Sequence, residues 1–121
     1  MEDRTAREAL DRARIMDLIA GYAYFYDEGE LDRFMDLFWD DATLDITPDP
    51  GFFPLPLVGR AAIDVAYRGR YAEVSVEARR RHIQSNTLFL ATSPTEIRTA
   101  TFLVAMSVPR DEGGVRLLGT G

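Results

Sequence analysis

The sequence predicts an α+β domain in which N-terminal helices pack on one face of a curved sheet. In three segments before residue 70, apolar residues recur at spacings of three and four, which is typical of helices that bury one side. From residue 81 onward, β-branched and apolar runs are separated by turn residues, which is typical of antiparallel strands. The chain has 121 residues, 46% of them hydrophobic, enough for one domain with its own core. We therefore expect residues 1–121 to form a single α+β domain.

The first helix should begin near Thr5, because Thr5 and Glu8 have the spacing of a capping box. It should end before Gly29, a residue type that commonly follows a helix. Residues 18–26 are apolar on nearly every side, so other elements should enclose this half of the helix.

Two more helices should follow. The second is short, begins near Leu31 and ends near residues 39–41. The third should run from about Gly59 to Gly69. Residues 70–80 are ambiguous, and they form either the tail of this helix or a loop.

The strands should form an antiparallel meander. Residues 42–46 read as a short strand, and residues 47–56 hold four prolines, which exclude a helix or a central strand there. Turn residues at 93–94 and 111–114 separate the C-terminal strands. These strands are expected at residues 81–91, 96–108 and 115–121.

Scarce residue types exclude much of the catalytic repertoire. The chain has no cysteine, no lysine and one histidine. It therefore has no thiolate nucleophile, no Schiff-base lysine and no multi-histidine metal site within one chain. We expect no metal and no cofactor, so proton chemistry near neutral pH would depend on the histidine or on a perturbed carboxylate.

The charge and hydropathy patterns narrow the partners. A net charge of −6 argues against nucleic acid, because phosphate binding needs a basic face. No apolar stretch approaches the roughly 20 residues of a membrane span. The charged N-terminus lacks the apolar segment of a signal peptide, so we expect a soluble, cytoplasmic protein.

Asp27 is the first candidate site residue. It continues a stripe of small apolar side chains on the first helix, formed with Ala20 and Ala23. It also lies in the last helical turn, where the helix dipole disfavours a carboxylate by roughly 0.3–1 kcal/mol. Either Asp27 has a specific partner, or it lies exposed in the turn before Gly29.

His82 is the second candidate. In an extended strand, His82, Gln84 and Asn86 point to one face, followed there by Leu88 and Leu90. Such a polar row suits one wall of an otherwise apolar cavity. The alternative is a surface strand with this side in solvent.

Together, Asp27 and His82 could form a general acid/base dyad. A carboxylate on one ring nitrogen fixes the tautomer and leaves the other nitrogen to take a proton from the substrate. Tyr22, Tyr26 and Asn86 are candidates for holding a substrate oxygen, although each tyrosine could equally serve as core packing.

Several motifs resemble those of SnoaL-like proteins of the nuclear-transport-factor-two-like superfamily. They are Ile15-x-x-Leu18-x-x-x-Tyr22-Ala23-x-x-x-Asp27-x-Gly29-Glu30-Leu31-Asp32, Phe38-x-Asp40-Asp41-Ala42, Arg81-His82-x-x-x-Asn86 and Leu117-Leu118-Gly119-Thr120-Gly121. The resemblance covers nearly the whole chain. It implies a cone-shaped fold whose helices pack on a curved mixed, largely antiparallel sheet that encloses a pocket.

The resemblance also implies site residues. Asp27 and His82 fall where scytalone dehydratase and a dehydrochlorinase of this superfamily keep an Asp–His dyad, and Tyr26 matches a dehydratase pocket tyrosine. The second dehydratase histidine and the dehydrochlorinase lysine have no counterpart, and the ketosteroid isomerase base would fall near Ile46. Family members usually continue past the Gly-Thr-Gly with further strand residues, so we expect the C-terminal strand of the fold to be missing from residues 1–121.

The leading expectation is a small cofactor-independent lyase or isomerase, similar to a dehydratase or polyketide cyclase. Its ligand would be a small apolar organic molecule, with an aromatic lining or lid from Phe38, Trp39, Phe52 and Phe53. The alternative is a non-catalytic ligand-binding module, or an assembly subunit similar to the small subunits of ring-hydroxylating dioxygenases. A homodimer or larger homo-oligomer is expected, and a stable oligomer with an empty vestigial pocket is a third possibility.

Overall fold

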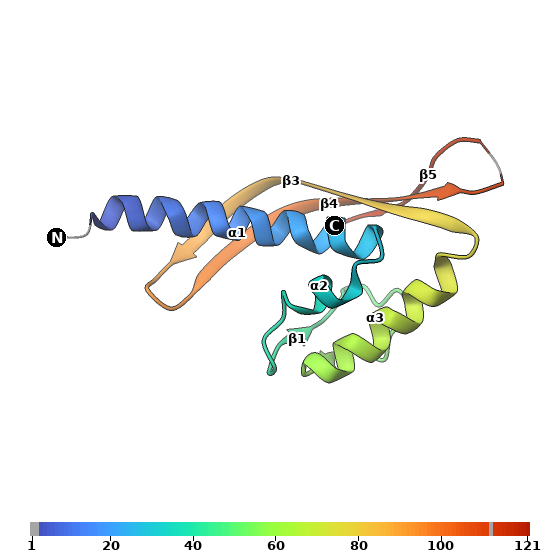
Figure 1. Ribbon diagram of the computed structural model, residues 1–121, viewed down its shortest axis with the longest axis horizontal. Coiled ribbons are helices and arrows are strands. Elements are labelled where there is room, and N and C mark those ends of the chain that lie inside the picture. Colours follow the sequence, from blue (N-terminus) through green and yellow to red (C-terminus); the bar gives the residue numbers. More distant parts are fainter. Residues whose placement is uncertain (1–2, 112) are drawn as a thin grey trace.

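The computed structural model describes residues 3–111 and 113–121 and has the predicted α+β architecture. Figure 1 shows the helices along one side of a long, twisted sheet. The helices are α1 (Arg4–Asp27), α2 (Leu31–Met35) and α3 (Arg60–Val74). The strands are β1 (Thr43–Leu44), β2 (Leu57–Val58), β3 (Ala78–Thr92), β4 (Ile97–Pro109) and β5 (Arg116–Thr120).

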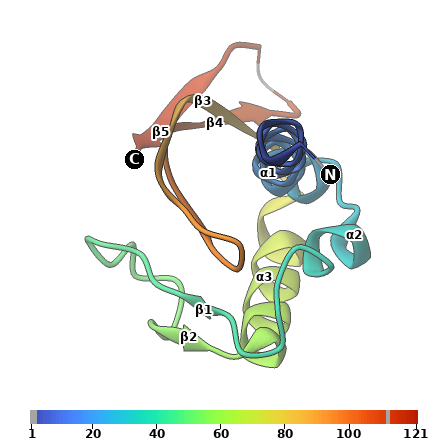
Figure 2. The ribbon, with the colours of Figure 1, turned by 90° about the vertical axis from the view of Figure 1, so that its left-hand side faces the viewer.

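The main sheet is an antiparallel meander in the order β3-β4-β5, as the sequence predicts. β1 and β2 form a separate antiparallel pair beside the N-terminal end of α3, as Figure 2 shows. The expected mixed sheet around a pocket is only partly correct. All pairings among the described residues are antiparallel, and the described sheet curves without closing.

The start of α1 differs slightly from the prediction, and its end agrees with the prediction. Asp3, not Thr5, caps the helix, because its side chain accepts the backbone N–H of Thr5 at 2.9 Å. The helix ends at Asp27, and Gly29 follows with a φ of 74°, a conformation that glycine adopts readily. A side chain at position 29 would collide with the ring of Tyr71 on α3. Gly29 therefore allows the chain to turn tightly against α3.

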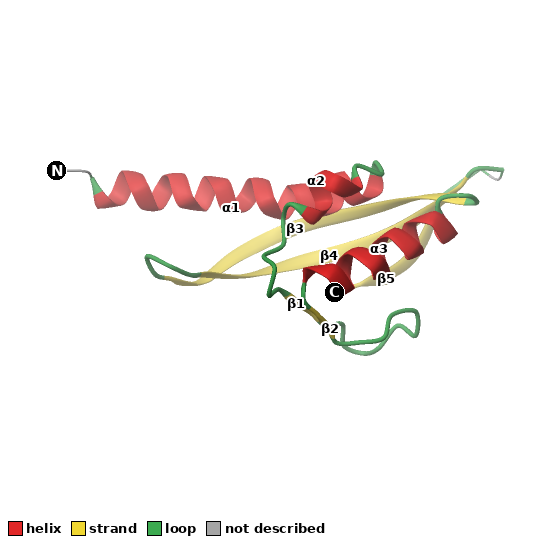
Figure 3. Ribbon diagram, turned by 60° about the horizontal axis from the view of Figure 1, so that its bottom comes forward, coloured by secondary structure: helices red, strands yellow, loops and turns green. Residues whose placement is uncertain are grey.

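The C-terminal half of α1 is enclosed on one side only. Gly21, Ala23 and Tyr26 are buried, whereas Leu18 is 48% exposed and Tyr24 is 63% exposed. The prediction that the whole half is enclosed is therefore wrong for the described residues. The reason is the layer arrangement: α1 contacts β3 and α2, and in the described part of the chain no other helix or strand covers its remaining outer side (Figure 3).

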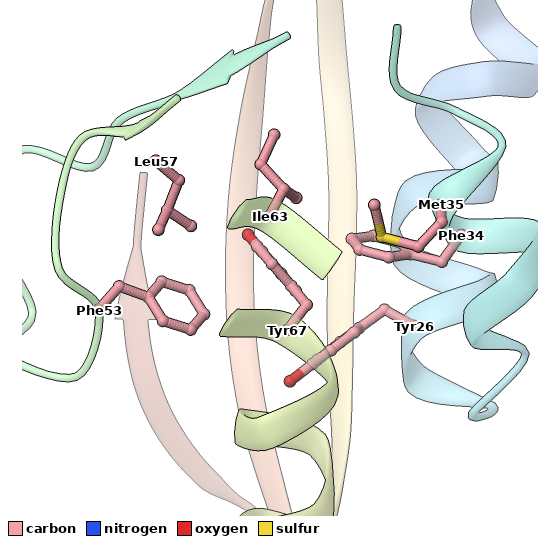
Figure 4. Packing of buried hydrophobic residues seen from close by; sticks show 7 residues of the cluster. All are labelled: Tyr26, Phe34, Met35, Phe53, Leu57, Ile63 and Tyr67. Carbon is pink, nitrogen blue, oxygen red and sulfur yellow. The ribbon is translucent and has the colours of Figure 1, made fainter. Parts of the chain in front are cut away.

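The core is a cluster in which aromatic rings predominate. Phe34 and Ile63 are completely buried in it, the proline-rich loop contributes Phe53, and β2 contributes Leu57. Figure 4 shows how the side chains converge from α1, α2, α3 and the loop. The cluster comprises Tyr26, Phe34, Met35, Phe53, Leu57, Ile63 and Tyr67.

Charged residues tie α2 to α3 at the surface. The guanidinium of Arg68 lies 2.6 Å from Asp32 on α2 and 2.6 Å from Asp64 on its own helix.

Residues 70–74 complete α3, so the ambiguous segment begins as a helix tail before β3 starts at Ala78. α3 thereby leads directly into the strand that carries His82.

Candidate functional site

Asp27 binds His82 through both of its carboxylate oxygens. Its Oδ1 lies 2.6 Å from Nδ1 of the His82 ring, and its Oδ2 accepts the backbone N–H of His82 at 2.7 Å. The Asp27 side chain is 5% exposed and the His82 side chain 20% exposed. One carboxylate therefore holds both the ring and the main chain of the same residue.

The fold explains why these two residues meet. β3 is an edge strand of the described sheet and pairs with β4 on one side only, so the His82 N–H is available to the end of α1. Glu28 adds an ion pair with Arg81 at 3.0 Å, next to the first contact. Two hydrogen bonds to the Asp27 carboxylate offset the unfavourable helix dipole at that position.

The contact determines what the imidazole can do. An ionised carboxylate only accepts hydrogen bonds, so Nδ1 of the His82 ring donates to Asp27. In the neutral ring the other nitrogen, Nε2, then carries no proton and has a lone pair for a substrate proton. A ring held in this way can act chemically as an oriented general base.

Tyrosines surround the dyad on its inner side. The Tyr26 ring packs edge-on against the His82 ring with centroids 5.9 Å apart, and it also contacts Tyr67. The hydroxyls of Tyr22 and Tyr67 share a hydrogen bond of 2.7 Å. Tyr67 was not among the predicted site residues, since its position on α3 marks it only as an apolar-face residue.

Burial makes these phenols poor acids. It raises the pKa of Tyr26 to about 12, an effect that the nearby Arg70 partly opposes. Burial also raises the pKa of Tyr22 and that of Tyr67 above the ordinary phenol value. Near neutral pH all three therefore remain protonated and can donate hydrogen bonds.

Asn86 does not continue the polar row of His82 and Gln84. A β-bulge interrupts the pairing between Ser85 and Leu88, and Asn86 lies within it, exposed and with a φ of 57°. The extra residue reverses the alternation, so Leu88 is exposed where a regular strand would turn it inward. The expectation that Asn86 shares a face with His82 is corrected by this bulge.

The predicted aromatic lining is divided between core and surface. Phe53 is buried in the core, and Phe38 packs partly buried against it. Phe52 is 45% exposed beneath the Arg70 guanidinium, and Trp39 is 84% exposed. These four side chains do not form a single wall.

Two hollows in the described part of the molecule lie away from the His82 ring. One, of about 320 Å³, is an open depression between α2 and α3 lined largely by the charged residues that join them. The other, of about 20 Å³, touches Tyr26 and Asp27 and has room for about one water molecule. His82 lines neither of them.

Within residues 3–111 and 113–121, no three histidine, aspartate or glutamate side chains gather in a way that could hold a metal ion. None of the helices in that part of the chain is long and apolar enough to cross a membrane.

Comparisons with known proteins agree with this architecture. A family model described as a SnoaL-like domain matches residues 7–121. No curated protein matches the chain.

Solved structures share the fold at low sequence identity. ActVI-ORFA from Streptomyces coelicolor is 14% identical with a TM-score of 0.74, covering 90% of this chain and 76% of that one. A candidate scytalone dehydratase from Novosphingobium aromaticivorans is 19% identical with a TM-score of 0.70, covering 92% and 69%. The β subunit of a candidate aromatic-ring-hydroxylating dioxygenase from the same organism is 18% identical with a TM-score of 0.68, covering 94% and 76%.

The contact between Asp27 and His82 predicts the ring tautomer. Because the chain has one histidine, long-range ¹H–¹⁵N NMR should report the His82 ring without assignment and show the proton of the neutral ring on Nδ1. Asp27→Asn has only one accepting oxygen, so it should lower the free energy of unfolding by about 1–3 kcal/mol and disturb this tautomer. Asp17→Asn, at an exposed site on the same helix, is the control. A wild-type ring protonated on Nε2 would contradict the assignment.

The raised pKa of Tyr26 predicts a loss of stability at alkaline pH. Its folded pKa of about 12 lies above the unfolded value of about 10, so its contribution is fully present below pH 10 and disappears as the pH rises toward 12. Between about pH 9 and about pH 11.5, the wild type should lose about 2 kcal/mol more unfolding free energy than Tyr26→Phe. Urea titrations measure this, with Tyr24→Phe as the exposed control. Equal losses in wild type and Tyr26→Phe would show that Tyr26 does not contribute.

Proposed function

The chain belongs to the SnoaL-like domain family, and from that premise we propose that it is a cofactor-independent lyase or isomerase with His82 as its acid/base group. The observation that carries the proposal is the pair of hydrogen bonds that the Asp27 carboxylate accepts from the ring and the backbone of His82. A structural ion pair needs only one such contact. Fixing the ring and the strand together orients Nε2, which is what a general base requires.

The chemistry follows from the oriented ring. Nε2 of His82 takes a proton from a substrate carbon next to a carbonyl group, and the electron pair of the broken C–H bond moves toward the carbonyl oxygen. The imidazolium then returns the proton to a leaving hydroxyl, which departs as water in a dehydration, or to another carbon in an isomerisation. Asp27 stays ionised throughout and stabilises the imidazolium.

Neutral tyrosine hydroxyls are the groups that would donate hydrogen bonds to the substrate oxygen. The Tyr22 and Tyr67 hydroxyls hold two protons but share one hydrogen bond, so one O–H remains able to donate. We assign that donor, with Tyr26, to the carbonyl oxygen on which charge develops. Asn86, exposed in the bulge, is the weakest of the predicted oxygen-binding residues.

The surroundings favour a flat apolar ligand, aromatic or polyketide-like. The ring of His82 lies against the aromatic cluster through Tyr26. On α1, the stripe that ends at Asp27 is uncovered in its middle, where Met16 is 45% exposed and Ala20 is also exposed. The name of one structural neighbour refers to aromatic rings, which supports the same substrate class.

His82→Gln tests the proposed chemistry directly. Native mass spectrometry of the purified protein should reveal a bound small molecule, and turnover of that compound class should fall at least about 100-fold in His82→Gln with the fold retained. Asp27→Asn should fall similarly in kcat, because the ring loses its orientation. Tyr24→Phe, at an exposed site, should turn over normally. Full turnover by His82→Gln would exclude the dyad mechanism.

A second candidate function is assembly through the outer face of the sheet. This face carries exposed apolar side chains, with Ile83 at 52% and Phe102 at 64%, and Leu117 on β5 at 66%. Register places Phe102 opposite Ser85 and Ile83 opposite Val104, so these side chains form one surface. A patch of this kind suits a second copy of the chain or a larger subunit. The neighbour named as a dioxygenase β subunit supports this alternative.

Light scattering after gel filtration tests the assembly. The wild type should run as a homodimer or larger, and Phe102→Asp should reduce the mass to that of one chain, because it buries a charge in the contact. Thr95→Asp, in the exposed turn between β3 and β4, should leave the mass unchanged. A monomeric wild type would rule out self-association through this face.

A further inference from the structure

Gln84 has an unsatisfied polar atom beside the dyad. Its Oε1 atom is buried and accepts no hydrogen bond from any residue that the structure describes. A buried amide oxygen without a donor is unfavourable, because it has lost its water without gaining a partner. Such an atom in a native fold suggests that a ligand supplies the missing donor.

The position of Gln84 is that of a substrate contact. His82 contacts Asp27 of α1, and Phe89 lies under the Arg12 guanidinium at 4.8 Å, so this face of β3 turns toward α1 at both ends of the stretch. Gln84 lies between them on the same face as His82. The facing stripe of α1 is uncovered at Met16 and Ala20. A ligand lying on this uncovered stripe would meet the half-buried Gln84 side chain, whose amide group must turn toward the ligand for Oε1 to accept a hydrogen bond.

We propose that Gln84 is a specificity-determining residue whose amide oxygen accepts a hydrogen bond from a hydroxyl group of the substrate. Side chains two residues apart on one strand face are about 6.7 Å apart at the backbone. The substrate is then a hydroxylated flat molecule whose hydroxyl lies about that far from the carbon that His82 deprotonates. This inference takes the location of the substrate from the proposed function, but its test does not require turnover.

The test compares two probes that differ in one proton. 2-Naphthol can donate a hydrogen bond and 2-methoxynaphthalene cannot. Fluorescence titration should show that the wild type binds 2-naphthol roughly tenfold more tightly, and that Gln84→Met binds both equally. Ser85→Ala, which removes a polar group from the opposite face of the same strand, should keep the wild-type preference. The readout is equilibrium binding and not turnover, so loss of turnover in His82→Gln and loss of the probe preference in Gln84→Met are separate results.

A thermal melt provides an independent measurement. Gln84→Met removes an unpaired buried acceptor and should raise Tm by about 4 °C without ligand. The proposal is overturned if Gln84→Met lowers Tm, since the amide would then already have a partner within the protein. It is equally overturned if the wild type binds neither probe, or binds the two probes with equal affinity.

Discussion

The carboxylate of Asp27 is the interaction on which the rest of the structure depends. It joins the last turn of α1 to an edge strand that pairs on one side only among the described residues, and it determines the orientation of the single imidazole. Burial and the helix dipole both oppose a carboxylate at this position, and the two donors of His82 offset them. The interaction is therefore structural, and in the proposed function it also orients the acid/base group.

Core and site share residues in this protein. Tyr26 is a member of the buried cluster, and its ring also contacts the imidazole. The Tyr22–Tyr67 hydrogen bond connects α1 and α3 through the same aromatic packing. Such sharing keeps the site rigid, because the groups around His82 are held by the side chains that stabilise the fold.

Local patterns in the sequence predicted the elements well and their surroundings less well. The period change near residue 81 and the turn residues at 93–94 predicted the meander, whereas the position of Asp27 left open whether it has a partner or lies exposed, and the structure shows the partner. Asn86 and Phe53 could not be placed in the same way. A bulge depends on pairing between distant strands, and the burial of a loop phenylalanine depends on which helix the loop packs against. The unpaired oxygen of Gln84 is a property of the packed structure, which no residue pattern displays.

The bulge at Asn86 acts as a phase shift within one strand. Before it, even-numbered residues such as His82 and Gln84 turn toward α1, and after it odd-numbered residues such as Thr87 and Phe89 do. Deleting one residue there would restore regular pairing as far as Phe89, where a second register shift begins, and would rotate Leu88 inward, placing an aliphatic group on the polar side. One insertion or deletion at this point therefore decides whether polar or aliphatic side chains of β3 face α1.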